Sequence, residues 1–439
     1  MTVPMARVCA RSQALGVGRS QRPGAKRPEC EMSVTTLTGE PASLPETTGT
    51  EPSRDLIARA GALRPLIGEH ADQGNREGRV VPEVIDAMAG QGLLSLTVPR
   101  RYGGAETNSR TTVDVLAELA RADGSTGWSA MLLNVGNWFA TTWSVRAQDE
   151  IWAADPAARC CVVLAPSAKG RRVDGGYVVT GRWPYASGSY AASHAMMGFL
   201  APQADGGMRH ALGILHPGEW TVERSWFPIG MRATGSDTVV AEEVFVPDHR
   251  VQYFHDMVAG DYATELRHAE PRANAAFLPT GTIIFGAVQI GLGRAALEQS
   301  VARMKAKGVP GTAYTESRNS PVHQVSVAQA ASKIDAAELL AHRSCRDIDE
   351  AALRGEYLDQ LTRARVRNDT GHIVTLVQEA VDLLLKAAGS SSFMEASPLA
   401  RIFQDVGTGG SHVHATPGIA NDVYGKLLLG AEGPLPVEV

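Results

Sequence analysis

The amino-acid sequence predicts an α+β protein in which a helical region is followed by a β-rich region and then by a second helical region. Apolar residues recur at helix-like spacing over residues 52–155. Over residues 156–255 they form short runs rich in Val, aromatic and β-branched residues, separated by Gly, Asp and Pro, which is typical of a β-barrel or sandwich. Over residues 256–439 the helical spacing returns in runs long enough for a helical bundle. These three segments are the predicted domains.

The first region is expected to contain amphipathic helices and one buried helix. Residues 126–143 are mostly apolar and carry three tryptophans, so we expect a helix covered on all sides. Residues 98–104, VPRRYGG, contain Pro and paired Gly and predict a loop.

The last region predicts four main helices, over 280–305, 322–352, 358–388 and 397–406. In the final one, Arg401 and Asp405 are four residues apart and would share one helix face. The Gly-rich stretch GTGG then predicts a break before His412, a side chain that can take or give a proton near neutral pH. The GLGR stretch at 291–294 follows no strand, so we interpret its glycines as sites of close helix packing.

The composition excludes several classes of protein. The net charge is -5 and the pI about 6.2, which does not suggest a nucleic-acid surface. The five cysteines form no CxxC pair, and His412 and His414 have no nearby carboxylate, so we expect no zinc or other metal site and a cytoplasmic location. No apolar run reaches the roughly 18 residues of a membrane helix, so no membrane is expected as a partner.

Residues 1–51 are expected to be a disordered tail. They contain no Phe, Trp or Tyr, are rich in Pro, Gly, Ser and Thr, and show no amphipathic period. Their first part carries Arg and Lys but lacks the compact apolar stretch of a targeting peptide. Met32 is therefore a plausible true start of translation.

Two segments could contact a flat cofactor. In residues 181–190, GRWPYASGSY, a strand ends in aromatic and then small side chains that offer hydroxyl groups and close backbone approach, namely Trp183, Tyr185, Ser187 and Gly188. Taken alone, this segment favours an ordinary strand-to-loop exit, and it is a second segment that favours a cofactor contact. In residues 230–240, GMRATGSDTVV, short polar side chains surround a glycine and could bind an anion, namely Arg232, Thr234 and Ser236.

Arg318 stands just before the helix expected at 322–352. An Arg at a helix start suits a phosphate or diphosphate, although for Arg318 by itself a plain surface charge is the favoured interpretation. The chain contains no GxxxxGK[ST] motif and no dinucleotide-binding fingerprint.

These motifs, in this order, resemble the acyl-CoA dehydrogenase superfamily over residues 52–439. GQGLLSLTVPRRYGG at 90–104 is similar to its N-terminal segment, and SPLARIFQDV to its C-terminal one. Within the superfamily, WPYASG and SHV resemble the flavin-dependent monooxygenases, the oxygenase halves of two-component hydroxylases. The resemblance implies a helical domain, a middle β-barrel and a helical bundle, reduced flavin (FMNH2 or FADH2) and O2, a separate NAD(P)H-flavin reductase, and a homotetramer.

The sequence also departs from the family pattern. Gln404 replaces the usual Arg before Asp405, and Gly136 stands where a substrate-contacting His is common. We therefore expect a roomier substrate pocket lined by Gly136, Asn137, Trp138 and His412. No Asp or Glu occurs between Asp405 and Asp422, or between Glu270 and Glu298. The acid that acyl-CoA dehydrogenases use for proton abstraction is therefore missing.

The resemblance assigns roles to these residues. Ser187 would hydrogen-bond near flavin N5 and steady a C4a-hydroperoxide, and Trp183 and Tyr185 would shape and dry the pocket. His412 would deprotonate or orient a substrate hydroxyl or amine. Arg318 would reach the flavin across a subunit boundary. The predicted function is hydroxylation of an aromatic or polyketide-like small molecule. The alternatives are N-oxygenation of an amine or amino sugar, acyl-CoA dehydrogenation, and a flavin-free binding protein.

Overall fold

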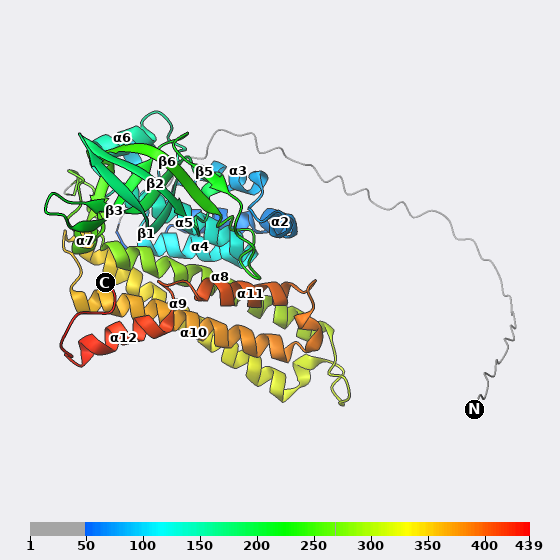
Figure 1. Ribbon diagram of the computed structural model, residues 1–439. Coiled ribbons are helices and arrows are strands. Elements are labelled where there is room, and N and C mark those ends of the chain that lie inside the picture. Colours follow the sequence, from blue (N-terminus) through cyan, green and yellow to red (C-terminus); the bar gives the residue numbers. More distant parts are fainter. Residues whose placement is uncertain (1–48, 268) are drawn as a thin grey trace, which may run out of the picture. The chain divides into compact units, whose positions relative to one another are not determined.

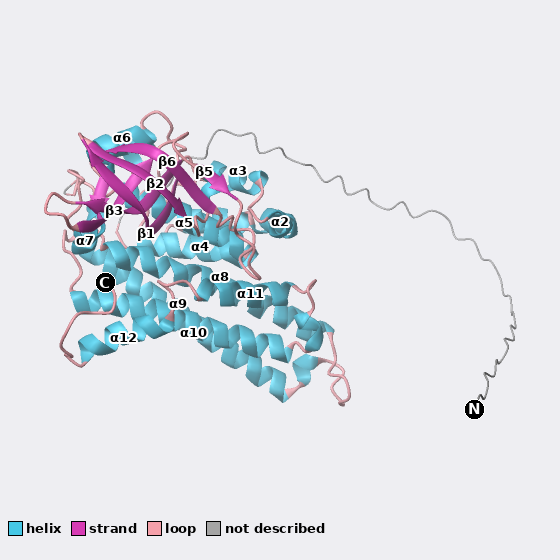
Figure 2. Cartoon of the chain, viewed as in Figure 1, coloured by secondary structure: helices cyan, strands magenta, loops and turns pink. Residues whose placement is uncertain are grey.

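The computed structural model describes residues 49–267 and 269–439. The tail predicted for residues 1–51, with Met32, lies outside the described residues except for its last three positions. The predicted order of a helical, a β and a second helical region is confirmed (Figures 1 and 2).

The first helical region contains α1 (Arg54–Ala62), α2 (Arg64–Glu77), α3 (Pro82–Gly90), α4 (Ser109–Ala122), α5 (Gly124–Ala140) and α6 (Val145–Trp152). Every residue of α5 is buried, which confirms the covered helix predicted from its three tryptophans. The helix begins after Asp123, whose carboxylate accepts a hydrogen bond from the N–H of Thr126 at 2.8 Å. This cap fixes the N-terminal end of α5, a helix that lines the candidate site.

One mixed sheet follows, built from β1 (Cys160–Val173), β2 (Gly176–Trp183), β3 (His194–Pro202), β4 (Met208–Leu215), β5 (Thr221–Glu223), β6 (Thr238–Pro247) and β7 (Val251–Tyr253). The strand order is β5-β6-β2-β1-β3-β4-β7, and only β1 and β3 run parallel among the described pairs. The terminal strands β5 and β7, three residues each, are not hydrogen-bonded to one another. Among the described residues the predicted barrel is therefore open between β5 and β7.

The last region contains α7 (Phe254–Ala259), α8 (Phe277–Ala306), α9 (Pro321–Leu353), α10 (Gln360–Ala387), α11 (Pro398–Gly410) and α12 (Pro417–Leu428). The long helices α8, α9 and α10 pack on one another, and α8 also lies against α4 (Figure 1). The four predicted helices are confirmed, but α11 continues through the GTGG stretch to Gly410. The predicted break was wrong because Gly409 and Gly410 are needed for close packing, with Trp128, Met231 and Gln378 where a β-carbon would lie.

Helix α8 carries the apolar residues that hold the two helical regions together. By length and composition alone it could cross a membrane, but 78% of its most apolar window is buried inside the fold. A β-carbon at Gly291 would lie 2.3 Å from the carbonyl oxygen of Ala117 in α4. One at Gly293 would lie 3.2 Å from Ile334 in α9. The interpretation of GLGR as a close-packing site is confirmed.

Candidate active site

A cavity of about 610 Å3 lies where α5, the sheet and the C-terminal helices meet. Its walls come from α5, β1, the loops after β2 and β5, α8, and the end of α11 with the loop that follows. Most lining side chains are apolar, and two groups of polar side chains among the remainder are close enough to act together. One group is a set of hydroxyls, Ser187, Thr234 and Ser236, and the other is the histidine pair His412 and His414.

The hydroxyl group forms a continuous chain of hydrogen bonds. Trp128 Nε1 donates to Ser187 Oγ at 3.1 Å. Ser187 Oγ and Ser236 Oγ are 2.6 Å apart, and Ser236 Oγ and Thr234 Oγ1 are also 2.6 Å apart. Thr234 Oγ1 in turn donates to the carbonyl oxygen of Met231 at 2.9 Å. The sequence predicted Ser187, Thr234 and Ser236 as cofactor contacts, and the structure brings all three to one wall.

The turn at the end of this chain is fixed from outside the cavity. Met231 has a φ of 55°, a backbone conformation that a side chain disfavours. Its N–H donates to Asp405 Oδ1 at 2.5 Å, and its carbonyl oxygen also accepts from Trp226 Nε1 at 2.9 Å. Burial, and then the neighbouring carboxyl of Asp123, raise the pKa of Asp405 to about 7. The carboxyl predicted beside Arg401 is thus an anchor for a cavity loop, whereas Arg401 turns away and pairs with Asp72.

His412 lies among aromatic rings at another part of the wall. Its ring stacks on Phe285 with 4.4 Å between centroids and meets Trp128 edge-on at 5.8 Å. Burial between these rings, followed by the positive charge of Arg367, lowers the pKa of His412 to about 4. Burial, then His412 and Arg367, lower the pKa of His414 to about 3. Both histidines are therefore neutral at physiological pH.

One hydrogen bond determines which ring nitrogen of His412 carries the proton. His412 Nδ1 accepts the backbone N–H of His414 at 3.3 Å. Because Nδ1 acts as an acceptor, the single proton of the neutral ring is on Nε2. His412 is thus a hydrogen-bond donor toward a ligand.

Arg367 of α10 stands directly behind the histidine loop. It is only 4% exposed, donates from Nη2 to the carbonyl oxygen of Val413 at 3.1 Å, and places Nη1 3.5 Å from His414 Nδ1. Among residues 49–267 and 269–439, no carboxylate is within ion-pair distance of its guanidinium, and its Nε has no hydrogen-bond partner. Burial alone accounts for the lowered pKa of Arg367. A buried cation without a counter-charge is costly, so its place behind His412 calls for a functional reason.

Several predicted site residues do not reach the cavity. Trp183 is fully buried in the sheet, where its Nε1 donates to the carbonyl oxygen of Gly198 at 2.6 Å. Gly188, with a φ of 77°, lies against Leu133 and forms the turn that presents Ser187. Tyr185 does line the cavity, but its side chain is 66% exposed at the mouth.

Gly136 and Asn137 also serve packing. A β-carbon at Gly136 would lie 2.1 Å from the carbonyl oxygen of Cys160, so this glycine lets α5 approach β1. Asn137 donates to the carbonyl oxygen of Leu94 and accepts the N–H of Cys160. The expectation that Gly136 enlarges the substrate pocket is not met, because position 136 faces the strand and not the cavity.

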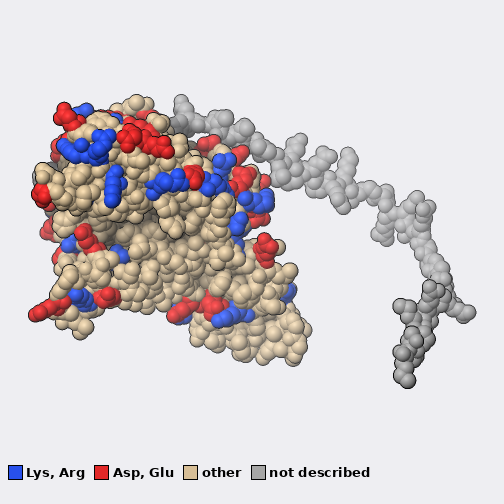
Figure 3. All heavy atoms as spheres, in the orientation of Figure 1, with Lys and Arg blue, Asp and Glu red and all other residues tan. Residues whose placement is uncertain are grey.

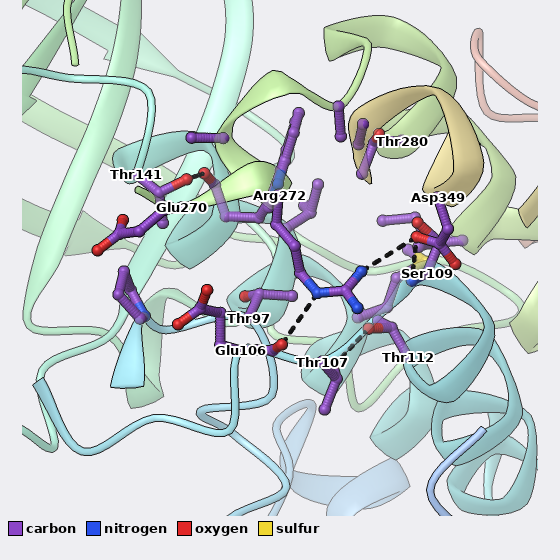
Figure 4. Close-up of a pocket in the computed structure, with 18 residues that line it drawn as sticks. Thr97, Glu106, Thr107, Ser109, Thr112, Thr141, Glu270, Arg272, Thr280 and Asp349 are labelled. Atoms are coloured by element: carbon purple, nitrogen blue, oxygen red, sulfur yellow. Dashed lines mark hydrogen bonds and ion pairs between the residues drawn. The ribbon is translucent and has the colours of Figure 1, made fainter. Parts of the chain in front are cut away.

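Trp138 lines a second, smaller cavity of about 40 Å3 that shares only Val135 with the main one. Figure 4 shows that Arg272 extends across this space, donating to the carbonyl oxygen of Glu106 and to Asp349. Asp349 also accepts the N–H of Ser109 at the start of α4. The small cavity therefore belongs to a polar network that joins α4, α9 and the segment before α8.

Arg232, predicted in an anion-binding loop, and Arg318, predicted to bind a phosphate, lie outside the cavity. Arg232 donates to the carbonyl oxygens of Asn75 and Pro228 at the surface. Arg318 pairs with Glu316 at 2.6 Å, and its side chain is 55% exposed. Within one chain neither arginine contributes to the hydroxyl chain or to the histidine group.

The sequence analysis missed Trp128, Phe285, Met231 and Arg367 as parts of the site. Trp128 and Phe285 lie in apolar helical runs that look like core, and only the fold turns one edge of each toward the cavity. Arg367 lies in a helix rich in arginine, RARVR, where nothing local sets it apart from its ion-paired neighbour Arg365.

The cavity fits the isoalloxazine ring of a flavin. That ring is flat and apolar on both faces, with polar atoms along its edges, and the wall offers apolar side chains together with a row of hydroxyls. Each hydroxyl keeps one unused lone pair that can accept from a ligand N–H.

Comparison with known proteins agrees with this geometry. The N-terminal domain of acyl-CoA dehydrogenases matches residues 60–157, and their C-terminal domain matches residues 283–417. The fold and the site therefore define a flavoprotein of the acyl-CoA dehydrogenase type.

More specific relatives are oxygenases. The oxygenase subunit HsaA, a flavin-dependent monooxygenase of Rhodococcus jostii, is 30% identical over 373 residues, which cover 84% of this chain and 97% of that protein. The oxygenase component of p-hydroxyphenylacetate 3-hydroxylase of Acinetobacter baumannii is 26% identical, covering 89% of this chain and 92% of that protein. The structure of XiaF from Streptomyces sp. with FADH2 and glycerol has a TM-score of 0.83 and 31% identity, covering 88% of this chain and 97% of that one. This chain belongs to the flavin-dependent monooxygenase branch of the acyl-CoA dehydrogenase superfamily.

Proposed function

We propose that this chain is the oxygenase component of a two-component hydroxylase and that it hydroxylates an apolar aromatic or polyketide-like molecule. The main support is the composition of the cavity, which combines the Ser187 hydroxyl chain and a neutral His412 with no Asp or Glu among its described lining residues. Reduced flavin, when bound, supplies the oxygen-activating chemistry.

The hydroxyl wall would hold the polar edge of the ring near N5, with Ser187 as the nearest contact. Trp226 and Tyr185, whose rings meet edge-on at 5.9 Å, would cover the mouth of the cavity. Apolar side chains over most of the remaining wall would exclude water, which protects a reactive oxygen species from hydrolysis.

His412 would orient the substrate by donating a hydrogen bond. An efficient general base has a pKa near the working pH, whereas the pKa of His412 is about 4, so its neutral ring is a weak base. The proton on Nε2 can instead bind a substrate oxygen and stabilise the negative charge that grows on it as the ring is attacked. Of the two predicted roles, orientation is therefore favoured over deprotonation.

The substrate would be largely apolar with one hydroxyl or carbonyl group. Outside the hydroxyl wall, the side chains that face the cavity from α5 and α8 include Leu132, Phe139, Leu278 and Phe285. Such a surface gives little recognition of charged groups and favours fused or substituted rings.

The alternatives predicted from the sequence have less support. An acyl-CoA dehydrogenase needs a carboxylate base, and none lines the described cavity. N-oxygenation would place an amine, protonated at neutral pH, against a histidine whose free nitrogen is a donor and near the positive Arg367. A flavin-free binding protein would not need a polar wall matched to a ring edge.

We also propose a separate NAD(P)H-flavin reductase and a homotetramer as partners. The helical region carries exposed apolar side chains on α9, including Val322, Val325 and Leu339. In Figure 3 a broad part of the helical region bears few charged side chains, as expected for a surface covered by other subunits. In such an assembly Arg318 could reach the flavin of a neighbouring subunit.

A coupled assay tests the proposed function. The chain is mixed with a flavin reductase, NADH, and either FMN or FAD, and is given a panel of phenols and fused-ring phenols. We expect a hydroxylated product that requires the reductase, with less H2O2 per NADH when a substrate is present. H2O2 release that no member of the panel changes would contradict the proposal.

A further inference from the structure

The hydroxyl chain on the cavity wall has a single direction, because the carbonyl oxygen at its far end can only accept a hydrogen bond. A carbonyl oxygen has no proton to give, so the 2.9 Å contact between Thr234 Oγ1 and the Met231 carbonyl requires the proton of Thr234. At the other end the indole nitrogen of Trp128 can only donate, so Ser187 Oγ accepts from it at 3.1 Å.

The middle of the chain follows by counting protons. Each hydroxyl has a single proton, and that of Thr234 is already used. The 2.6 Å contact between Ser236 and Thr234 therefore needs the proton of Ser236. The 2.6 Å contact between Ser187 and Ser236 then needs the proton of Ser187. All protons point from Trp128 toward Met231.

Toward a ligand, the wall therefore offers lone pairs and no proton. Ser187, Ser236 and Thr234 are each 5% exposed or less, and each hydroxyl proton already has an acceptor within the chain. Reversing the chain would leave Thr234 Oγ1 facing the carbonyl of Met231 without a proton. It would also leave the proton of Ser187 without an acceptor. The Met231 carbonyl could not turn away to relieve this, because Asp405 and Trp226 hold the turn in place.

We propose that Ser236 and Thr234 are positioning residues that hold the proton of Ser187 away from the cavity, so that Ser187 favours the N–H of reduced flavin over the lone pair of oxidised flavin. The inference rests on the proposed function, in which Ser187 faces flavin N5. Reduction by two electrons adds a proton at N5, which changes this atom from an acceptor into a donor. The reduced ring can donate to Ser187 Oγ, whereas the oxidised ring would bring one lone pair against another.

The test is the ratio of the dissociation constants for oxidised and reduced flavin, measured by anaerobic titration of the full chain with FMN and with FAD. For the wild type we expect reduced flavin to bind at least about tenfold tighter, the value of one buried hydrogen bond. In Ser236→Ala the proton of Ser187 loses its acceptor and becomes free to bind oxidised N5. In Thr234→Val, Ser236 can turn back and donate to Ser187, with the same result.

We expect both variants to lower the ratio by about tenfold, mainly through tighter binding of oxidised flavin. The midpoint potential of the bound flavin should fall by about 30 mV toward that of free flavin, the two-electron equivalent of a tenfold change. Thr370→Val is the matched control, because this buried threonine of α10 donates to the carbonyl oxygen of Val366, outside the cavity. It should leave the ratio and the potential unchanged. A general loss of packing would weaken both redox states together and would not move the potential.

The outcomes separate the two proposals. If both variants bind reduced flavin but keep the wild-type ratio and potential, the directed chain does not select the redox state and this inference fails alone. If the wild type binds neither FMN nor FAD in either redox state, the proposed function fails and this inference fails with it.

Discussion

Replacing Arg367 by Met should make hydroxylation sensitive to mild acid. The substitution keeps most of the buried volume and removes a positive charge that has no carboxylate partner within the described part of the chain. This charge is the second cause, after burial, of the low pKa of His412. Without it, we expect the pKa of His412 to rise from about 4 toward the ordinary value of 6.5.

The size of the effect follows from these two limits. At pH 5.5, a pKa of about 4 leaves about 97% of His412 neutral, whereas a pKa of 6.5 would leave about 9% neutral. Protonation would place a proton on Nδ1 against the backbone N–H of His414 and so turn the ring and its Nε2–H out of position. Product formation at pH 5.5 relative to pH 7.5 should therefore fall by up to about tenfold. Since burial is the larger cause, the observed shift should be smaller than this limit.

The assay is hydroxylated product per NADH between pH 5 and 8, with reductase in excess. Arg367→Lys keeps a positive charge and should keep the flat wild-type profile. Arg365→Met is the matched control on the same helix, because Arg365 pairs with Asp347 and not with the histidine loop. A profile for Arg367→Met that is as flat as that of the wild type would refute the reasoning. An acid limb in Arg365→Met would show that the effect is not specific to this charge.

Three further changes test other parts of the site. His412→Ala should leave flavin binding intact but lower coupled product formation by about 10²-fold, as for loss of one oxyanion donor. His412→Gln keeps an N–H donor and should recover part of the activity. Equal product yields in the wild type and both variants would remove His412 from the mechanism. Gly136→Ala should lower the free energy of unfolding by about 1–3 kcal/mol in urea titrations, because the new β-carbon would lie 2.1 Å from the Cys160 carbonyl oxygen. An unchanged free energy of unfolding would show that α5 can shift away from β1. Asp405→Asn should gain melting temperature over the wild type as pH rises from 5 to 8. The folded pKa of Asp405, about 7, lies above the unfolded value of 3.8, so ionisation of this carboxyl costs the wild type stability as pH rises through this window. A difference in melting temperature that stays constant with pH would contradict the raised pKa.

The order of the three regions and the positions of the long helices could be predicted from the sequence, because hydrophobic spacing reports directly which face of an element is buried. Local sequence pattern gave wrong predictions for three glycines. Gly409 and Gly410 looked like a helix end, yet they continue α11 because Trp128, Met231 and Gln378 approach them from elsewhere in the chain. Gly136 looked like a gap in a pocket, yet it allows contact with a strand.

The site residues that could be predicted are those in short polar segments of the sequence. Ser187, Thr234, Ser236 and His412 do line one cavity. The direction of the hydroxyl chain could not be predicted, because it depends on the Met231 carbonyl and on contacts between Ser187 and the 234–236 segment that exist only in the fold. Arg367 could not be recognised either, since nothing in a helical segment of sequence distinguishes a buried arginine from a surface arginine.

The most direct test of the central claim is transfer of oxygen from 18O2. The chain is mixed anaerobically with chemically reduced FMN or FAD and a panel of fused-ring phenols, without reductase, and 18O2 is then admitted. The account predicts a hydroxylated product that carries one 18O atom and is formed only when the chain is present. Reoxidation of protein-bound flavin that yields only H2O2 with every member of the panel, together with flavin reduction on addition of an acyl-CoA, would contradict it and would indicate a dehydrogenase.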